Sequence, residues 1–177
     1  MEPSGESLVS KLNKIGIALS SEHNLEKLLG MIVREIRSFT NADGGTLYIK
    51  EGDELSFEVA QNETLKRRFG DAPFQSFKIP ISHNSIAGHV VLSGTLLNIS
   101  NLDEVGDEVP FSLETMRQFD KKMDYKSVSM LAVPMRNHKD EIIGVIQLFN
   151  SLDVNNTPVP FDKSIEDLVI SLASQAA

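Results

Sequence analysis

Three stretches of the chain carry apolar residues at the three- and four-residue spacing of an amphipathic helix. They cover about residues 6–19, 25–39 and 165–176. In the first stretch the apolar positions are Leu8, Leu12, Ile15 and Leu19. A narrow stripe of this kind is typical both of packing on a sheet and of a parallel dimer seam, so the pattern leaves both roles open.

Between these helices the apolar residues alternate or cluster as they do in β-strands. Strands are predicted at residues 46–50, 54–61, 74–81, 95–99, 127–136 and 141–150, with short helices at 86–92 and 111–123. Residues 41–45 are interpreted as a turn, residues 62–73 as a mobile polar connection, and residues 151–160 as a turn-rich excursion.

The last two strands, 127–136 and 141–150, are apolar on both faces. Strands of this kind lie at the centre of a sheet that is covered on both sides. Their polar exceptions, Ser127, Ser129 and Gln147, would need hydrogen-bond partners or a bound molecule if they are buried. The order of elements predicts an α+β fold with helices grouped on a mostly antiparallel sheet.

Composition narrows the possible partners and compartments. The chain has 177 residues and a net charge of −8, which argues against nucleic acid and anionic membranes as partners. Without a secretory signal or an apolar run of about 20 residues, it is expected to be cytoplasmic. Because it has no cysteine, disulfides, Fe–S clusters, cysteine nucleophiles and a covalently attached bilin are excluded.

The histidines and the acidic residues give weak signals for metal binding. His23, His83, His89 and His138 are scattered, and the middle two are six positions apart rather than the three or four of one helical turn. The acidic segment at residues 101–110 lacks the spacing of an EF-hand loop. We therefore expect no metal site and a solvated acidic loop.

Several short motifs, in their order, resemble those of a GAF domain, the small-molecule sensing module of phosphodiesterases, cyclases and bacterial sensors. They are Ala42-Asp43 before the first strand, Ser85–Val90, Leu97–Ile99, Ser129–Pro134 and Gly144–Asn150. The resemblance covers residues 20–177 and leaves residues 1–19 as a signalling or dimerisation helix. It implies a PAS-related, six-stranded antiparallel sheet, with terminal helices on one face and a ligand pocket roofed by short helices on the other.

The resemblance also implies which residues contact a ligand: Thr46, Gln61, Ser85, Ile86, Ala87, Met123, Ser127 and Gln147. Three of them differ from the family members that bind cyclic nucleotides: Gln61 and Gln147 stand where those have acidic residues, and Met123 replaces a threonine. Each lost charge-assisted hydrogen bond is worth about 1.5–3 kcal/mol, enough in combination to re-tune the pocket or to abolish binding.

Two functions follow from this resemblance. The first is a regulatory sensor, expected in bacteria, that binds a cyclic nucleotide or another small anionic or purine-like ligand and signals through dimeric terminal helices. The last helix lacks a stop signal, so we expect it to continue into an effector domain outside this chain. The alternative is a ligand-free module that serves only dimerisation and structural coupling. Catalysis is not expected, because the chain has no GxSxG, HExxH or P-loop pattern.

Overall fold

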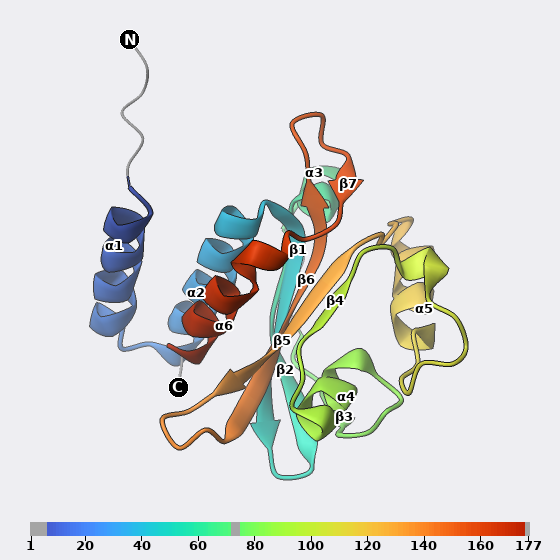
Figure 1. The fold of residues 1–177 in the computed structure, drawn as a ribbon, viewed down its shortest axis with the longest axis horizontal. Coiled ribbons are helices and arrows are strands. Elements are labelled where there is room, and N and C mark those ends of the chain that lie inside the picture. Colours follow the sequence, from blue (N-terminus) through green and yellow to red (C-terminus); the bar gives the residue numbers. More distant parts are fainter. Residues whose placement is uncertain (1–6, 72–74, 176–177) are drawn as a thin grey trace.

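The structure, a computed structural model that describes residues 7–71 and 75–175, contains within those residues one seven-stranded antiparallel sheet (Figure 1). The strand order is β3-β2-β1-β6-β5-β4, and the short strand β7 pairs with the end of β6, past the residues that pair with β5. The strands are β1 Ala42–Glu51, β2 Glu54–Asn62, β3 Lys78–Pro80, β4 Leu97–Ile99, β5 Met130–Arg136, β6 Ile142–Leu152 and β7 Pro158–Val159.

Helices lie on both faces of this sheet (Figure 1). One face is covered by α1 Leu8–Ser21, α2 Leu25–Thr40 and α6 Glu166–Ser174, and the other by α4 Ile86–Ser93 and α5 Glu114–Met123. Helix α3 Glu63–Phe69 follows β2, and single 3-10 turns form at η1 Leu102–Glu104 and η2 Lys163–Ile165. The predicted α+β layering, with the long terminal helices on one face and short helices on the other, is confirmed.

Strands β5 and β6 contribute to two separate apolar cores, as expected for central strands. On one face Leu131, Val133, Ile146 and Leu148 pack with residues of α2 and α6. On the other face Met130, Ala132 and Val145 pack with Ile86, Ala87 and Val90 of α4. Full burial of a large apolar side chain stabilises the fold by about 1.5–3 kcal/mol, so the two cores together fix the position of β6.

The apolar stripe of α1 packs on the domain itself. Ile15 and Leu19 are buried in the core shared with α2 and α6, and Leu12 packs against it. Of the two roles that the sequence left open for this stripe, the structure therefore shows packing on the domain, and the stripe is not available as a dimer seam. Val9 and Ile17, elsewhere on the helix, are 66% and 71% exposed. Residue 6, the side chain of Leu8 and residue 176, which belonged to the predicted helical stripes, lie outside the described residues.

The prediction of a turn through residues 41–45 is wrong beyond its first residue. Asn41 does adopt the left-handed conformation, with φ of 54°, but β1 begins directly after it. The glycines that suggested a turn serve close packing instead, because a Cβ on Gly45 would lie 2.8 Å from Cγ1 of Val33 in α2. A glycine in a strand here allows the helix to approach the sheet closely.

The polar connection predicted at residues 62–73 contains helix α3. Asn62 caps it by accepting a hydrogen bond from the backbone N–H of Leu65, and Gly70 ends it. The helix buries none of its residues, so it has no apolar stripe from which it could have been predicted. Strand β3 is also shorter than the predicted 74–81, of which residue 74 lies outside the described residues.

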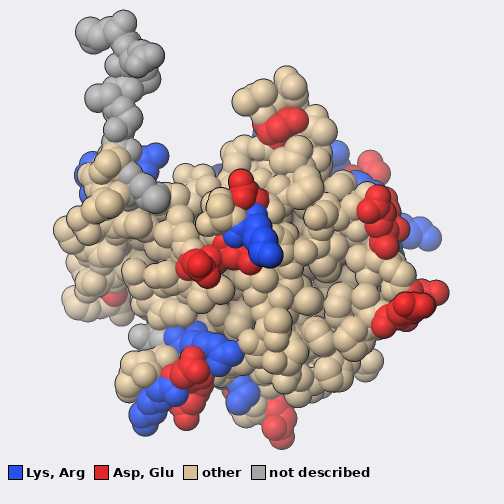
Figure 2. Space-filling model, viewed as in Figure 1, with Lys and Arg blue, Asp and Glu red and all other residues tan. Residues whose placement is uncertain are grey.

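On the face seen in Figure 2, acidic and basic side chains lie interspersed, with wide uncharged areas between them. The acidic loop was predicted to be solvated, but one of its carboxylates forms ion pairs. Lys126 Nζ lies 2.7 Å from a carboxylate oxygen of Asp103, and Arg117 also contacts that carboxylate. Among the described residues no helix is both long and apolar enough to span a membrane.

A buried arginine attaches α2 to the start of the sheet. Arg37, only 9% exposed, donates from Nε to the carbonyl of Ala42 over 3.3 Å and from Nη2 to that of Asp43 over 3.0 Å. Its Nη1 donates to Oε1 of Gln61 over 3.0 Å, and Gln61 Nε2 donates to the carbonyl of Gly30 in α2. One guanidinium therefore joins α2, β1 and β2.

Replacing Arg37 by alanine would leave two buried backbone carbonyls and the partly buried amide oxygen of Gln61 without their donor. We expect Arg37→Ala to lower the free energy of unfolding by about 2–4 kcal/mol, measured from urea denaturation midpoints. Arg34→Ala is the matched control, since the side chain of Arg34 is 64% exposed, and it should change stability by less than about 0.5 kcal/mol. Equal effects of the two substitutions would contradict this role of Arg37.

Candidate functional site

The face of the sheet beneath α4 carries one polar pair at its centre. Thr46 of β1 and Gln147 of β6 lie directly opposite each other, and Thr46 Oγ1 donates to Gln147 Oε1 over 3.3 Å. Because side chains alternate along a strand, they share this face with Tyr48 and Val145, which pack toward α4. Gln147 is 7% exposed, so a neutral, buried amide lies among apolar side chains.

Helix α4 begins above this face with the predicted Ser-Ile-Ala motif. Ser85 caps the helix, its Oγ accepting from the N–H of Gly88 over 3.0 Å, and Ile86 and Ala87 are buried in the apolar cluster. A Cβ on Gly88 would lie 2.2 Å from the carbonyl oxygen of Ser82. The glycine therefore allows the chain before the helix to cross its first turn in close contact.

The connection from α5 to β5 holds two further predicted residues. Ser127 is buried, but its N–H and Oγ donate to the two carboxylate oxygens of Asp120 in α5, over 2.9 and 2.8 Å. Its donors are thus already used within the protein. Met123 is half-buried at the end of α5, just before Asp124, which adopts a left-handed conformation with φ of 48°.

The structure separates Gln61 from the other predicted ligand contacts. Its side chain bonds to Gly30 and Arg37 of α2, on the opposite face of the sheet. The reason is an extra residue in β2: Leu47 pairs with Val59 but Tyr48 pairs with Phe57, which leaves Glu58 unmatched. Such a bulge reverses the faces of all the residues that follow it.

A hydrogen-bonded group that sequence reasoning missed lies at the ends of β1 and β6. Tyr125 OH donates to Oδ2 of Asp43 over 2.8 Å, and Asn150 Nδ2 donates to the same hydroxyl over 2.9 Å. Asn150 also accepts from the N–H groups of Val128 and Ser129. These bonds fasten the segment after α5 to the sheet.

Burial governs the electrostatics of this group. Asp43 is 4% exposed, and no described residue donates a hydrogen bond to its Oδ1. Burial, followed by the negative charge of Asp43, raises the pKa of Tyr125 above its ordinary value. Burial alone raises the pKa of Tyr48, which faces the apolar cluster under α4, to about 12.

A second missed contact joins His83, in the loop before α4, to His89 within that helix. Their Nδ1 atoms are 2.9 Å apart and their ring centroids 5.1 Å apart. The ring of His89 lies 5.1 Å from that of Phe111, and burial, then the charge of His83, lowers the pKa of His89. Among the described residues no group of three or more histidine, aspartate or glutamate side chains is arranged to hold a metal ion.

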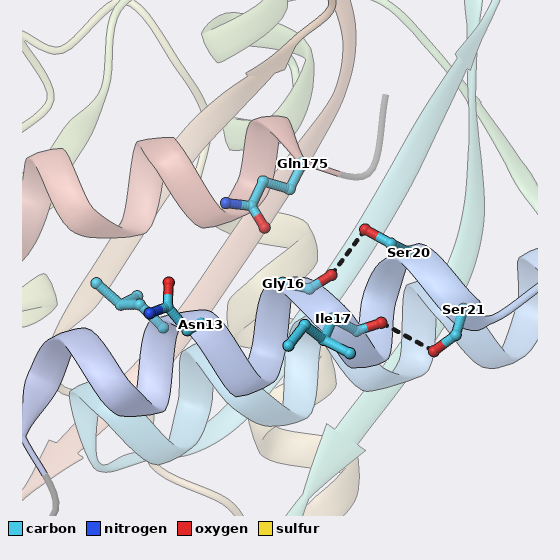
Figure 3. Close-up of a pocket in the computed structure, with 7 residues that line it drawn as sticks. Asn13, Gly16, Ile17, Ser20, Ser21 and Gln175 are labelled. Atoms are coloured by element: carbon cyan, nitrogen blue, oxygen red, sulfur yellow. Dashed lines mark hydrogen bonds between the residues drawn. The ribbon is translucent and has the colours of Figure 1, made fainter.

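An open groove of about 570 Å³ lies elsewhere, between α1 and the end of α6 (Figure 3). Gln175 points from α6 toward α1, where the hydroxyls of Ser20 and Ser21 donate to carbonyls of their own helix. The groove is lined by Leu12, Asn13, Gly16, Ile17, Ser20, Ser21 and Gln175. It belongs to the helix layer and not to the face that carries Thr46 and Gln147.

Comparison with known proteins gives consistent results. The family model for the GAF domain matches residues 24–177. A cGMP-specific 3',5'-cyclic phosphodiesterase from Drosophila sechellia is 28% identical over 139 residues, which cover 75% of this chain but 11% of the phosphodiesterase. The chain therefore spans about a tenth of the length of that relative.

Solved structures agree with this fold. The GAF domain of an Acinetobacter phosphoenolpyruvate-protein phosphotransferase superposes with a TM-score of 0.68 at 15% identity, covering 95% of this chain and 89% of that one. Residues 122 to 287 of a methyl-accepting chemotaxis protein superpose with a TM-score of 0.67 at 16% identity, covering 92% of both chains. At these identities the likeness concerns the fold.

The two tyrosines, the only ones in the chain, should ionise late in the folded protein. Because their folded pKa values are raised above the unfolded value of about 10, the stability they contribute is complete below pH 10 and is lost as pH rises through the folded pKa. We expect phenolate absorbance to appear near pH 10 in urea and near pH 12 for Tyr48 in the native protein.

The control for this titration is Tyr125→Phe, which leaves Tyr48 as the sole signal. Coincident titration curves in urea and in native buffer would contradict the burial of both phenols.

Proposed function

Because this chain belongs to the GAF domain family, we propose that its role as a regulatory sensor module is to bind a small molecule and to pass the bound state to an effector domain of the same protein. The observation that carries the proposal is the sheet face beneath α4, where the Thr46–Gln147 pair lies within an apolar surface. A few polar groups in an apolar enclosure are typical of small-molecule sites.

The proposed ligand is a cyclic nucleotide or another small, anionic or purine-like molecule. The similarity to cGMP-specific phosphodiesterases supports the cyclic nucleotide. A neutral amide such as that of Gln147 both donates and accepts hydrogen bonds, and in this way amides pair with the edge of a purine. The start of α4 at Ser85 favours an anionic group, because the first N–H groups of a helix point outward with the positive end of its dipole.

Helix α5 and the segment after it are proposed to form the roof over the ligand. They are held by three side-chain contacts: Ser127 with Asp120, Tyr125 with Asp43, and Asn150 with the backbone of Val128 and Ser129. In this proposal Met123, at the end of α5, adjusts to the bound molecule, since methionine is unbranched and conformationally adaptable. Gln61 is no longer proposed as a contact.

Transmission is proposed to run through the helix layer, in a homodimer. Helix α2 is attached to β1 and β2 by Arg37, so a shift of these two strands reaches α2 and the helices packed on it. In this proposal residues 1–19, which include most of α1, are the signalling segment and residues 20–177 are the sensor. Since the buried stripe of α1 packs on its own domain, the proposed dimer contact uses the exposed side with Val9 and Ile17, beside the groove of Figure 3.

The second candidate is a GAF module without a ligand, which serves only dimerisation and structural coupling. Two observations favour it: the donors of Ser127 are taken by Asp120, and the groove of Figure 3 lies in the helix layer. Neither proposal assigns a catalytic activity to the domain. A cytoplasmic location, a bacterial source and the absence of nucleic-acid and membrane partners stay predictions from the sequence.

Ligand binding is tested by thermal unfolding with cyclic AMP and cyclic GMP. At a ligand concentration 100 times the dissociation constant the folded state gains about 2.7 kcal/mol, a shift of several degrees in Tm. We expect the shift to disappear in Gln147→Leu and Thr46→Val. It should persist in Gln175→Leu, because Gln175 directly follows α6 and lines the groove in the helix layer (Figure 3). If neither nucleotide shifts Tm in the unaltered protein, cyclic AMP and cyclic GMP are excluded as the ligand.

Dimerisation is tested by sedimentation equilibrium. Ile17→Glu places a charge on the exposed side of α1 and should weaken the dimer at least tenfold, because burying an unpaired charge in an apolar contact is costly. Val154→Glu is the control: Val154 is 97% exposed and lies in the turn between β6 and β7. Unchanged association of Ile17→Glu would exclude this face of α1 as the interface.

A further inference from the structure

The contact between His83 and His89 is not used by the proposed sensor function, yet it brings two metal-ligating side chains together. We propose that these two histidines bind a divalent transition-metal ion through their Nδ1 atoms, in place of the hydrogen bond between them. The proposal concerns borderline ions such as Cu²⁺ and Ni²⁺, for which imidazole is a preferred ligand.

The separation of the two nitrogens fits one class of coordination geometry. Metal–imidazole bonds are about 2.0–2.1 Å long, so two nitrogens on adjacent corners of a square or octahedron lie about 2.9 Å apart, and on a tetrahedron about 3.4 Å apart. The Nδ1 atoms are 2.9 Å apart. The spacing therefore suits the right angle of Cu²⁺ or Ni²⁺ better than the tetrahedral angle of Zn²⁺.

Binding requires each ring to turn. With centroids 5.1 Å apart and nitrogens 2.9 Å apart, the two Nδ1 atoms now face each other almost directly, as donor and acceptor of a hydrogen bond. An ion beside the line between the nitrogens needs the rings to rotate toward it about χ2. That torsion has a broad intrinsic energy profile in histidine, so a small rotation of each ring from its present angle is tolerated.

Both ligands are held by surrounding structure before an ion arrives. His89 lies within α4, is 9% exposed and contacts the ring of Phe111. His83 is exposed, but its carbonyl accepts a hydrogen bond from the N–H of Ser112 over 3.1 Å, which fixes the backbone at that point. Pre-positioned ligands lose little conformational freedom on binding, and this raises affinity.

The surroundings also favour the protonation state that a metal needs. Metal ions bind neutral imidazole, and the burial of His89 favours its neutral form. Because His83 is exposed, water can fill the remaining coordination positions. The described residues offer no third histidine or carboxylate, so the ion is expected to exchange with solvent. Once bound, it would link the loop before α4 to the helix itself.

The probes are CuCl₂ and NiCl₂, added to the full chain without an affinity tag. We expect calorimetry to give one ion per chain, and the Cu²⁺ paramagnetic resonance spectrum to show coupling to two nitrogens. His83→Gln should weaken binding at least about tenfold, since losing even an outer-shell partner of a metal ligand costs 10–100-fold. His138→Gln, in the exposed turn between β5 and β6, is the matched control and should bind as the unaltered protein does.

Three outcomes would overturn the site: no binding by the unaltered chain, equal binding by His83→Gln, or copper coupling to a single nitrogen. Folding is checked by circular dichroism, and the exposure of His83 makes it safe to replace. If His89→Gln also folds, it should lose the ion to the same extent as His83→Gln. Binding retained in His89→Gln would likewise refute the pair.

Discussion

The confinement of β6 is the constraint on which the rest of the structure depends. The strand is hydrogen-bonded to β1 on one side and to β5 on the other, and an apolar core packs against each of its faces. A strand held in this way tolerates few polar side chains, because each must find a partner without water. Gln147 is the exception in its middle, and Thr46, the residue opposite, supplies its bond.

Most polar residues around this strand use their hydrogen bonds to hold the fold, and one of them keeps unused hydrogen-bond donors. Ser129 donates to the carbonyl of Val159, Ser127 donates to Asp120, and Asn150 anchors the chain before β5. Their hydrogen bonds are satisfied within the protein. The described residues give the amide nitrogen of Gln147 no partner, so its donors remain for a bound molecule or for water.

The sequence predicted most of the fold because apolar spacing reports directly on burial. The period of 3.6 located α1, α2 and α6, and the double-sided apolar runs located β5 and β6. The features that sequence reasoning missed leave no periodic pattern of apolar residues. The extra residue Glu58 reversed the face of Gln61, and the polar helix α3 has no apolar stripe. The contact between His83 and His89, six positions apart, comes from the loop that crosses α4 at Gly88.

The attachment of α2 by Arg37 has a consequence for how such a domain evolves. On β1 the guanidinium contacts main-chain carbonyls, so the attachment does not depend on which side chains that strand carries. What it does require is the absence of a side chain at Gly45, where a Cβ would lie 3.1 Å from Cδ of Arg37. Substitutions on the opposite face of β1, at Thr46 for example, can therefore change the surface beneath α4 without altering how α2 is attached to the sheet.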